Sequence, residues 1–240
     1  MSKPIQHLAI IRLSAMGDVA MTVPVIRALV EQHPKLKVTM VSRPFFKPFF
    51  DQIPNLTFFE IDLKKRHKGF LGLLRLFFDL KKLNIDAVAD LHHVLRSKII
   101  RNLMAFCGKK VAFTNKQRRE KKALTRTQNK VFKPLKSMFQ QHADTFAKLG
   151  FLIDLSRAIY PKKPLLSDEI LTLSGNKKNQ KWIGIAPFAQ YKPKIYPLDL
   201  MQNVIDELAS NTNHKIFLFG GKNREIEMLN SFAEIGRAHV

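Results

Sequence analysis

Residues 8–29 constrain the fold of this chain more than any other stretch, because they read as a buried strand, a short turn and a helix. Residues 8–13 form an apolar run broken by a single arginine, which is typical of a strand in a parallel sheet. Small and polar residues follow at 14–18, and 19–30 carries apolar side chains at helical spacing. This is the first half of a βαβ unit. Open α/β sheets bind ligands beyond the carboxyl ends of their strands, so we expect Asp18 at a functional edge.

Two roles are open for Asp18. Aspartate is favoured in the first turn of a helix by capping and by the helix dipole, which would make Asp18 structural. The alternative is a general base on the turn between strand and helix. Pro24 bears on the geometry, because proline is comfortable only in the first turn of a helix. The helix therefore either begins near Thr22, which leaves Asp18 in a loop, or is kinked.

The same alternation continues along the chain. The apolar periodicity predicts strands at 37–42, 56–61, 85–91 and 110–113, and helices at 69–83, 96–106 and 137–149. A stretch rich in Pro, Lys and Asn at 160–181 is the best linker candidate, with one extended segment at 164–173. The pattern then restarts with strands at 182–186 and 215–219, and helices at 198–209 and from 223 onward.

We therefore expect the α/β fold class with two Rossmann-type halves. The predicted boundaries are a first domain at 1–160, a linker at 161–181 and a second domain at 182–240. Two strands and two helices are too few to cover a doubly wound sheet, so we expect the second domain to be incomplete and the chain to be truncated.

Two apolar segments admit alternatives. Residues 43–50, RPFFKPFF, are expected to pack their aromatic rings on the core, whereas an exposed version would be an acceptor-site or membrane patch. The helix at 69–83 is expected to pack on a sheet face, the alternative being a helix that lies on anionic lipid. We favour packing for most of its apolar side chains and leave a lipid role for the flanking charges. Cys107 is expected to be a buried small apolar residue.

The net charge of +22, from 41 Lys and Arg against 19 Asp and Glu, indicates a polyanionic partner. Nucleic acid, anionic lipid and a phosphorylated substrate all fit, and part of the excess can serve solubility alone. The charge is densest from Arg101 to Lys136, where twelve Lys and Arg stand against Glu120. Residues 116–136 lack an apolar period, so we expect a loop or ragged helix that faces an anionic acceptor or the inner membrane leaflet.

Several classes are disfavoured. The amino-terminal residues do not form a secretory signal, and no apolar run reaches the length of a membrane span, so we expect a cytoplasmic protein that is soluble or attached to a membrane surface. A single cysteine rules out an intramolecular disulfide. His92 and His93 point in different directions and lack a third ligand at metal spacing, so neither a metal nor a cofactor is predicted. The turn after the first strand has only Gly17, which disfavours a nicotinamide site, and no P-loop follows a strand.

The first stretch resembles the opening of the lipopolysaccharide heptosyltransferases, glycosyltransferase family nine. Members begin with a strand, then Ser/Gly-x-x-Gly-Asp, a short apolar run and Pro-x-x-x-x-Leu. In this chain the pattern is formed by Ser14, Gly17, Asp18, Pro24 and Leu29.

Further motifs are similar to the same family. Asp90, Arg96 and Ser97 form Asp-x-x-x-x-x-Arg-Ser, and residues 141–150 resemble the helix near the end of the family's first domain. Residues 194–197 match Lys-x-[Trp/Tyr]-Pro. Asp90 and Arg96 are either cleft residues or simply an ion pair at the strand end, and we hold both alternatives open.

The second half also carries Gly220, Gly221 and Glu225, which resemble the family's strand-end glycines and acidic ribose contact. Ala189 and Gln190 stand where members often have Ser or Thr, a departure from the pattern. The family's later Asp-x-Gly-x-x-His segment has no counterpart within the sequence, so we expect little transfer from this chain alone.

The resemblance implies a GT-B-like pair of domains facing a cleft, and a metal-independent, inverting transferase. It would move a heptose-like sugar from a nucleotide-diphosphate donor such as ADP-heptose to the lipopolysaccharide core or a similar anionic, lipid-linked saccharide. The implied catalytic base is Asp18. The implied acceptor residues are Ser14, Gly17, Arg96 and Ser97. The implied donor residues are Lys194, Gln190, Gly220, Gly221 and Glu225.

The alternative from another class is a basic nucleic-acid-binding α/β protein without transferase activity. The charge supports it, and residues 116–136 could follow a phosphate backbone. It does not explain the βαβ repeats or the motif at 194–197, so we consider nucleic acid an unlikely partner. Salt-sensitive retention on DNA without nucleotide-sugar affinity would favour this alternative.

Overall fold

The computed structural model describes residues 4–157, 165–175, 180–221 and 224–236. The chain divides into two compact units, Met1–Lys162 and Lys163–Val240. The strands predicted at 8–13 and 182–186 lie in two separate sheets. The boundaries predicted at 160 and 181 stay a prediction, and parts of that linker, 158–164 and 176–179, lie outside the described residues.

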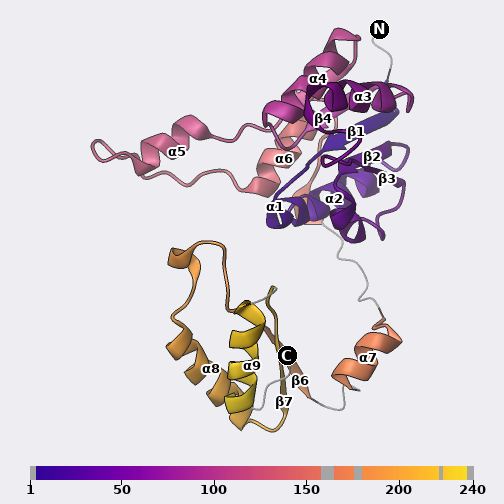
Figure 1. Ribbon diagram of the computed structural model, residues 1–240. Helices are drawn as coiled ribbons and strands as arrows, with labels where there is room; N and C mark the ends of the chain where they lie inside the picture. The colour runs from indigo at the N-terminus through magenta and orange to yellow at the C-terminus, as the bar shows by residue number, and fades with distance from the viewer. Residues whose placement is uncertain (1–3, 158–164, 176–179, 222–223, 237–240) are drawn as a thin grey trace. The chain divides into compact units, whose positions relative to one another are not determined.

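The first unit is built on a five-stranded, wholly parallel sheet (Figure 1). Its strands are β1 (His7–Ile11), β2 (Lys37–Ser42), β3 (Leu56–Glu60), β4 (Ala87–Asp90) and β5 (Lys110–Phe113). The spatial order is β3-β2-β1-β4-β5. All five predicted strands are confirmed, as are the α/β class and the Rossmann-type order. The chain leaves β1 first toward β3 and later toward β5, so the topological switch point lies between β1 and β4.

Helices cover both faces of this sheet. The helices of this unit are α1 (Met16–Ala20), α2 (Val23–Gln32), α3 (Gly69–Lys81), α4 (Leu95–Phe106), α5 (Arg118–Thr125) and α6 (Met138–Ala147), with the 3-10 segments η1 (Pro44–Phe49) and η2 (Leu155–Arg157). Of these, α5 buries no residue and does not cover the sheet. Successive strand side chains point to opposite faces. Leu8 and Ile10 therefore join one core with α2, η1 and α6. Ala9 and Ile11 join a second core, which α3 and α4 cover.

The sequence left open whether the helix after β1 begins near Thr22 or is kinked at Pro24. The long helix α2 begins at Val23, with Thr22 as its N-cap and Pro24 in its first turn. Asp18 lies before it, in the short helix α1. Asp18 is therefore part of neither a plain loop nor one kinked helix, because two helices meet at Thr22.

Residues 116–136, which we call the basic arm, extend from the sheet between β5 and α6 (Figure 1). The arm contains α5 and an irregular return segment, in agreement with the predicted loop or ragged helix. Its base is closed by Gln117: the amide nitrogen donates to the Lys136 carbonyl at 3.2 Å, and the amide oxygen accepts from the Lys136 N–H at 3.1 Å.

Three predictions for the first unit are wrong or only partly confirmed. Cys107 is exposed, because it follows the last residue of α4 instead of lying on its buried face. Phe46 and Phe50 are buried, as expected for residues 43–50, but Phe45 is exposed. In α3, Leu73 and Phe77 pack on the sheet whereas Phe70 and Leu71 do not.

The second unit has a two-stranded parallel sheet formed by β6 (Lys181–Ile185) and β7 (His214–Leu218). Its helical segments are α7 (Asp168–Ser174), η3 (Lys192–Lys194), α8 (Leu198–Ser210) and α9 (Arg224–Gly236). The extended segment predicted at 164–173 is wrong, because Ser167 caps α7 by accepting a hydrogen bond from the Ile170 N–H. Within the described residues, no helix has both the length and the apolar character needed to cross a membrane.

Gly72 fixes how closely α3 approaches the loop before it, which gives a test of the fold. A methyl group at Gly72 would lie 2.3 Å from the carbonyl carbon of His67, so backbone would have to move. Gly72→Ala should lower the free energy of unfolding by roughly 1–3 kcal/mol, measured by urea unfolding and far-UV circular dichroism. Gly17→Ala is the matched control, because its methyl group would have no neighbour within 4 Å. Equal stability of the two variants would contradict this packing.

Candidate active site

The candidate site of the first unit lies at its switch point, beyond the carboxyl ends of β1 and β4. Arg12 follows β1 and its side chain is 5% exposed. Its guanidinium donates from Nη1 to the Leu91 carbonyl at 2.7 Å and forms an ion pair through Nη2 with Asp18 Oδ2. Arg12 thus joins the ends of two neighbouring strands to α1. Asp18 is 47% exposed, so its carboxylate is held on one side and open to solvent on the other.

A polar cluster surrounds this pair. Ser14 Oγ lies 3.3 Å from His92 Nε2. Burial lowers the pKa of His92 to about 4, with the positive charges of Arg12 and Lys116 contributing to that shift. Burial also lowers the pKa of His142 to about 4, with Arg12 contributing. Both imidazoles are therefore neutral at physiological pH.

Lys116 belongs to the same cluster. Burial lowers the pKa of its ammonium group, and the neighbouring charges of Arg12 and Arg118 act in the same direction. The mutual influence of these groups shows that Lys116, from the base of the basic arm, shares the electrostatic environment of Arg12. The site therefore carries several cations and, in Asp18, one accessible carboxylate.

Three buried nitrogens in this cluster find no hydrogen-bond partner among the described residues: Arg12 Nε, His92 Nδ1 and His142 Nε2. Buried polar atoms are normally bonded, and unsatisfied ones often mark sites that bind water or a ligand. Arg12 Nε can only donate, and a neutral imidazole nitrogen can donate or accept. All three atoms are buried, so an ordered water would satisfy them.

The end of β4 is organised by Asp90, which is fully buried. Its Oδ1 accepts hydrogen bonds from the N–H groups of His92 at 3.0 Å and His93 at 2.7 Å. Its Oδ2 pairs with Arg101 at 3.3 Å. The suggested ion pair between Asp90 and Arg96 is therefore wrong, because Arg101, five residues further along α4, takes that place. Asp90 fixes the loop that presents His92.

The remaining acceptor residues lie at the same edge of the sheet. Gly17 is exposed in α1, and Arg96 is exposed in the first turn of α4. Ser97 is fully buried, and its hydroxyl bonds both the N–H and the carbonyl of Val94 at 3.0 Å. The structure thus gives Ser97 a helix-capping role, while its acceptor role stays a prediction.

The predicted donor residues share one edge of the second unit. Gln190 and Lys194 follow β6, and Gly220, Gly221 and Glu225 follow β7; because the strands are parallel, both connections lie at their carboxyl ends. Lys194 is exposed, with its Nζ 5.7 Å from the centre of the Tyr191 ring. The Gly221 N–H donates to Glu225 Oε2 at 2.6 Å.

Close packing explains Gly220. A methyl group there would lie 2.7 Å from Leu229 Cδ1 and 3.3 Å from the Phe188 ring. Phe188 belongs to the segment after β6 and Leu229 to α9, so glycine allows these two parts to meet beside β7. The loops that carry the donor residues are thereby brought into contact.

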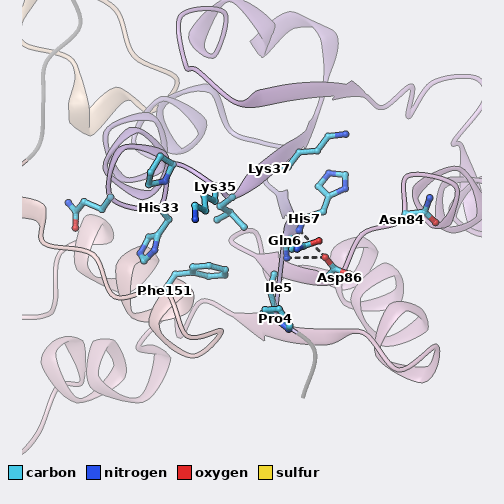
Figure 2. Close-up of a pocket in the computed structure, with 13 residues that line it drawn as sticks. Pro4, Ile5, Gln6, His7, His33, Lys35, Lys37, Asn84, Asp86 and Phe151 are labelled. Atoms are coloured by element: carbon cyan, nitrogen blue, oxygen red, sulfur yellow. Dashed lines mark hydrogen bonds between the residues drawn. The ribbon is translucent and has the colours of Figure 1, made fainter. Parts of the chain in front are cut away.

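A cavity of the first unit lies elsewhere. It measures about 880 Å³ and is lined from the starts of β1 and β2, at the edge opposite to Asp18 (Figure 2). Its polar groups are used internally: Asp86 accepts from the N–H groups of Gln6 and His7, and His33 Nε2 bonds the Leu152 carbonyl. None of the predicted site residues lines it. Over the described part of the chain, no group of three or more His, Cys, Asp or Glu is placed to hold a metal ion.

The sequence reasoning missed three members of the cluster: Arg12, Lys116 and His142. For Arg12 a signal existed, since a lone charge in a buried apolar run needs a partner. His142 and Lys116 gave no such signal, because each is one polar residue among many in its segment.

Residues 73–238 match the family model of glycosyltransferase family 9 (heptosyltransferase). A curated relative, the lipopolysaccharide core heptosyltransferase OpsX of Haemophilus influenzae, is 30% identical over 115 residues. That match covers 48% of this chain and 32% of the relative, so the chain spans about a third of the relative's length.

Two solved structures resemble the chain in fold. The glycosyltransferase family 9 protein of Veillonella parvula has a TM-score of 0.73 at 18% identity, over 98% of this chain and 68% of its own. The E. coli heptosyltransferase WaaC with ADP-2-deoxy-2-fluoro heptose has a TM-score of 0.64 at 17% identity, over 96% of this chain and 74% of its own.

The buried histidines predict a pH-dependent stability. An unfolded histidine has a pKa near 6.5 and folded His142 one of about 4, so the unfolded state binds more protons between these values. Stability contributed by neutral His142 is present above about pH 6.5 and is lost as the pH falls toward 4, by roughly 3 kcal/mol in full. Urea unfolding by circular dichroism at several pH values should show a smaller decline for His142→Gln.

His33→Gln is the control for this measurement, because His33 is partly exposed and lies outside the cluster. Its stability should decline with pH as in the unaltered chain. The single tryptophan, Trp182, lies in the second unit, so its fluorescence cannot replace circular dichroism here. A parallel decline for the unaltered chain and His142→Gln would contradict the neutral, buried histidine.

Proposed function

The chain belongs to glycosyltransferase family 9, and we propose that it carries the base and part of the donor site of a sugar transferase. The reaction proposed is transfer of a heptose-like sugar from a nucleotide-diphosphate donor such as ADP-heptose, with inversion at the anomeric carbon. The acceptor is a hydroxyl of the lipopolysaccharide core or of a similar lipid-linked saccharide. The family match and the curated relative support the reaction class.

The observation that carries the proposal is the Arg12–Asp18 pair at the switch point. Arg12 holds one oxygen of Asp18, while half of the side chain remains accessible. A carboxylate so oriented can take the proton of an acceptor hydroxyl as that oxygen attacks the anomeric carbon. The C–O bond to the diphosphate breaks as the new glycosidic bond forms, so the sugar is transferred with inversion.

Acceptor binding is proposed for the polar cluster and its neighbours. Ser14 and Gly17 flank the base, and His92 lies beside Ser14. Arg96 is exposed at the same edge and can pair with an anionic group of the acceptor. The basic arm, which begins at Lys116, extends this positive surface toward an anionic acceptor or lipid.

Donor binding is proposed for the carboxyl edge of the second unit. Lys194 is an exposed cation shortly before the start of α8, where a diphosphate is favoured by the helix dipole. Its charge can neutralise the departing diphosphate, which is the role a metal ion plays in other transferases. Gln190, Gly220 and Gly221 would approach the phosphates, and Glu225 the ribose.

We infer a cytoplasmic location for this reaction, at or near the inner face of the membrane. The lipid-linked acceptor and the basic arm support it. Salt-dependent binding to DNA without binding to ADP would instead favour the nucleic-acid alternative.

Asp18→Asn tests the base in an active form of the protein. Loss of general-base assistance should lower the transfer rate by about 10²–10⁴-fold, while affinity for ADP stays the same. Asp51→Asn is the control, since Asp51 is an exposed carboxylate outside the site. Full activity of Asp18→Asn would show that Asp18 is only a helix-start carboxylate held by Arg12.

Lys194→Ala tests the donor site. Removing a charge-assisted contact to the diphosphate should weaken ADP binding by about 10–100-fold, measured by calorimetry, and should lower the rate as well. Lys192→Ala is the matched control, because Lys192 is an exposed lysine in the same 3-10 turn. If the two substitutions weakened ADP binding equally, Lys194 would contribute only through the general positive charge of this segment. Chelation by EDTA should not change the rate.

A further inference from the structure

The first unit exposes large apolar side chains after each of its first four strands. They are Met16 after β1, Phe45 after β2, Phe70 and Leu71 after β3, and Leu95 after β4, with exposed fractions between 54% and 74%. All five side chains lie at or just before the first turn of a helical segment. Since the strands are parallel, these segments share the carboxyl edge of the sheet, where Asp18 also lies.

Single exposed apolar side chains are common on soluble proteins and need no explanation. Their gathering at one edge does, because contiguous apolar patches mark surfaces that bind a partner or a membrane. The exposed side chains are not needed to cover the sheet. In α3 the residues from Gly72 onward cover the second core, and in and after η1 Phe46 and Phe50 pack into the first core.

Basic residues accompany all of these side chains except Met16 in the same connections. They are Arg43 and Lys47 beside Phe45, Lys64, Lys65 and Lys68 before Phe70, and Arg96 beside Leu95. Of these cations, Lys47 is paired with Glu60 at 3.5 Å. Other acidic groups nearby are bonded within the chain. Asp62 accepts the N–H groups of Lys64 and Lys65, and Asp79 is paired with Arg66. The edge therefore carries apolar side chains within an excess of positive charge.

The connection after β5 has the same character. It is the basic arm, in which Phe132 is 80% exposed among lysines and arginines. Four of the five strands of the first unit, β2 to β5, are thus followed by segments that combine exposed apolar side chains with basic residues.

We propose that this edge docks on an anionic membrane surface. We call its five side chains, Met16, Phe45, Phe70, Leu71 and Leu95, the carboxyl rim. The rim enters the headgroup region of the lipid, and the surrounding lysines and arginines pair with anionic headgroups. The choice of a membrane over another acidic partner rests on charge complementarity and on the lipid-linked acceptor of the proposed function. Docking there would bring the membrane-anchored acceptor to the edge that holds Asp18.

Vesicle flotation with the full chain tests the rim. Vesicles of phosphatidylcholine alone are compared with vesicles that also contain phosphatidylglycerol, at low and at high salt. The chain should bind the anionic vesicles and be partly released by salt. Phe70→Ser with Leu71→Ser should weaken this binding about tenfold or more, because two apolar side chains no longer enter the lipid.

Phe106→Ser is the matched control. Phe106 is 93% exposed at the last residue of α4, which places it toward the opposite edge of the sheet. Its loss should leave vesicle binding unchanged. Circular dichroism and ADP binding should be the same for all three chains, so that altered folding or donor binding is detected separately.

Several outcomes would overturn the proposal. They are equal binding to neutral and anionic vesicles, unchanged binding of the Phe70/Leu71 variant, and an equal loss for Phe106→Ser. Binding to duplex DNA without binding to anionic vesicles would indicate that the partner of this edge is nucleic acid and not a membrane. Failure of the transfer reaction is a different result: Asp18→Asn should lose transfer and still float with anionic vesicles.

Discussion

The first unit depends on one buried cation. Arg12 stands at the end of β1, where a charge withdrawn from water is costly unless it is paired. It is paired twice, with the Leu91 carbonyl and with Asp18, and these contacts join β1, β4 and α1. Burial lowers its own pKa, and Asp18 opposes that shift. The pairing thus keeps a charged guanidinium at the switch point.

The same cation sets the electrostatics around it. Its charge adds to burial in lowering the pKa of His92, His142 and Lys116. The two imidazoles are therefore neutral beside a fixed arginine, whereas charged ones would add repulsion to an already positive site. Substitution of Arg12 would therefore change both the position of Asp18 and the protonation of its neighbours, so it would not isolate the base. This is why Asp18→Asn is the cleaner experiment.

The strands could be predicted from the sequence because each is a short apolar run, and the parallel order follows once helices alternate with strands. For the same reason the predicted site residues could be placed at the carboxyl edges of the two sheets. The contact of Arg12 with Leu91 could not be predicted, because the two residues lie far apart in the sequence. The partner of Asp90 could not be predicted either, because α4 carries both Arg96 and Arg101, and the sequence does not show which of them pairs. The wrong assignments at Phe45 and Cys107 have a related cause. Composition gives the apolar character of a side chain, but its burial depends on the turn at which a helix begins or ends.

The topology also explains why catalysis and docking are proposed for one edge. A parallel sheet sends all its strand-to-helix connections to its carboxyl end, so side chains there are free of the packing demands that fix the two faces. That freedom permits an accessible carboxylate at Asp18 and permits exposed apolar side chains such as Phe70. Exposed apolar groups favour aggregation in water, and the net charge of +22 opposes it through repulsion between copies. On an anionic surface the two features act together, because the charge draws the protein to the lipid and the rim holds it there. An acceptor anchored in that lipid would meet the base without leaving the membrane.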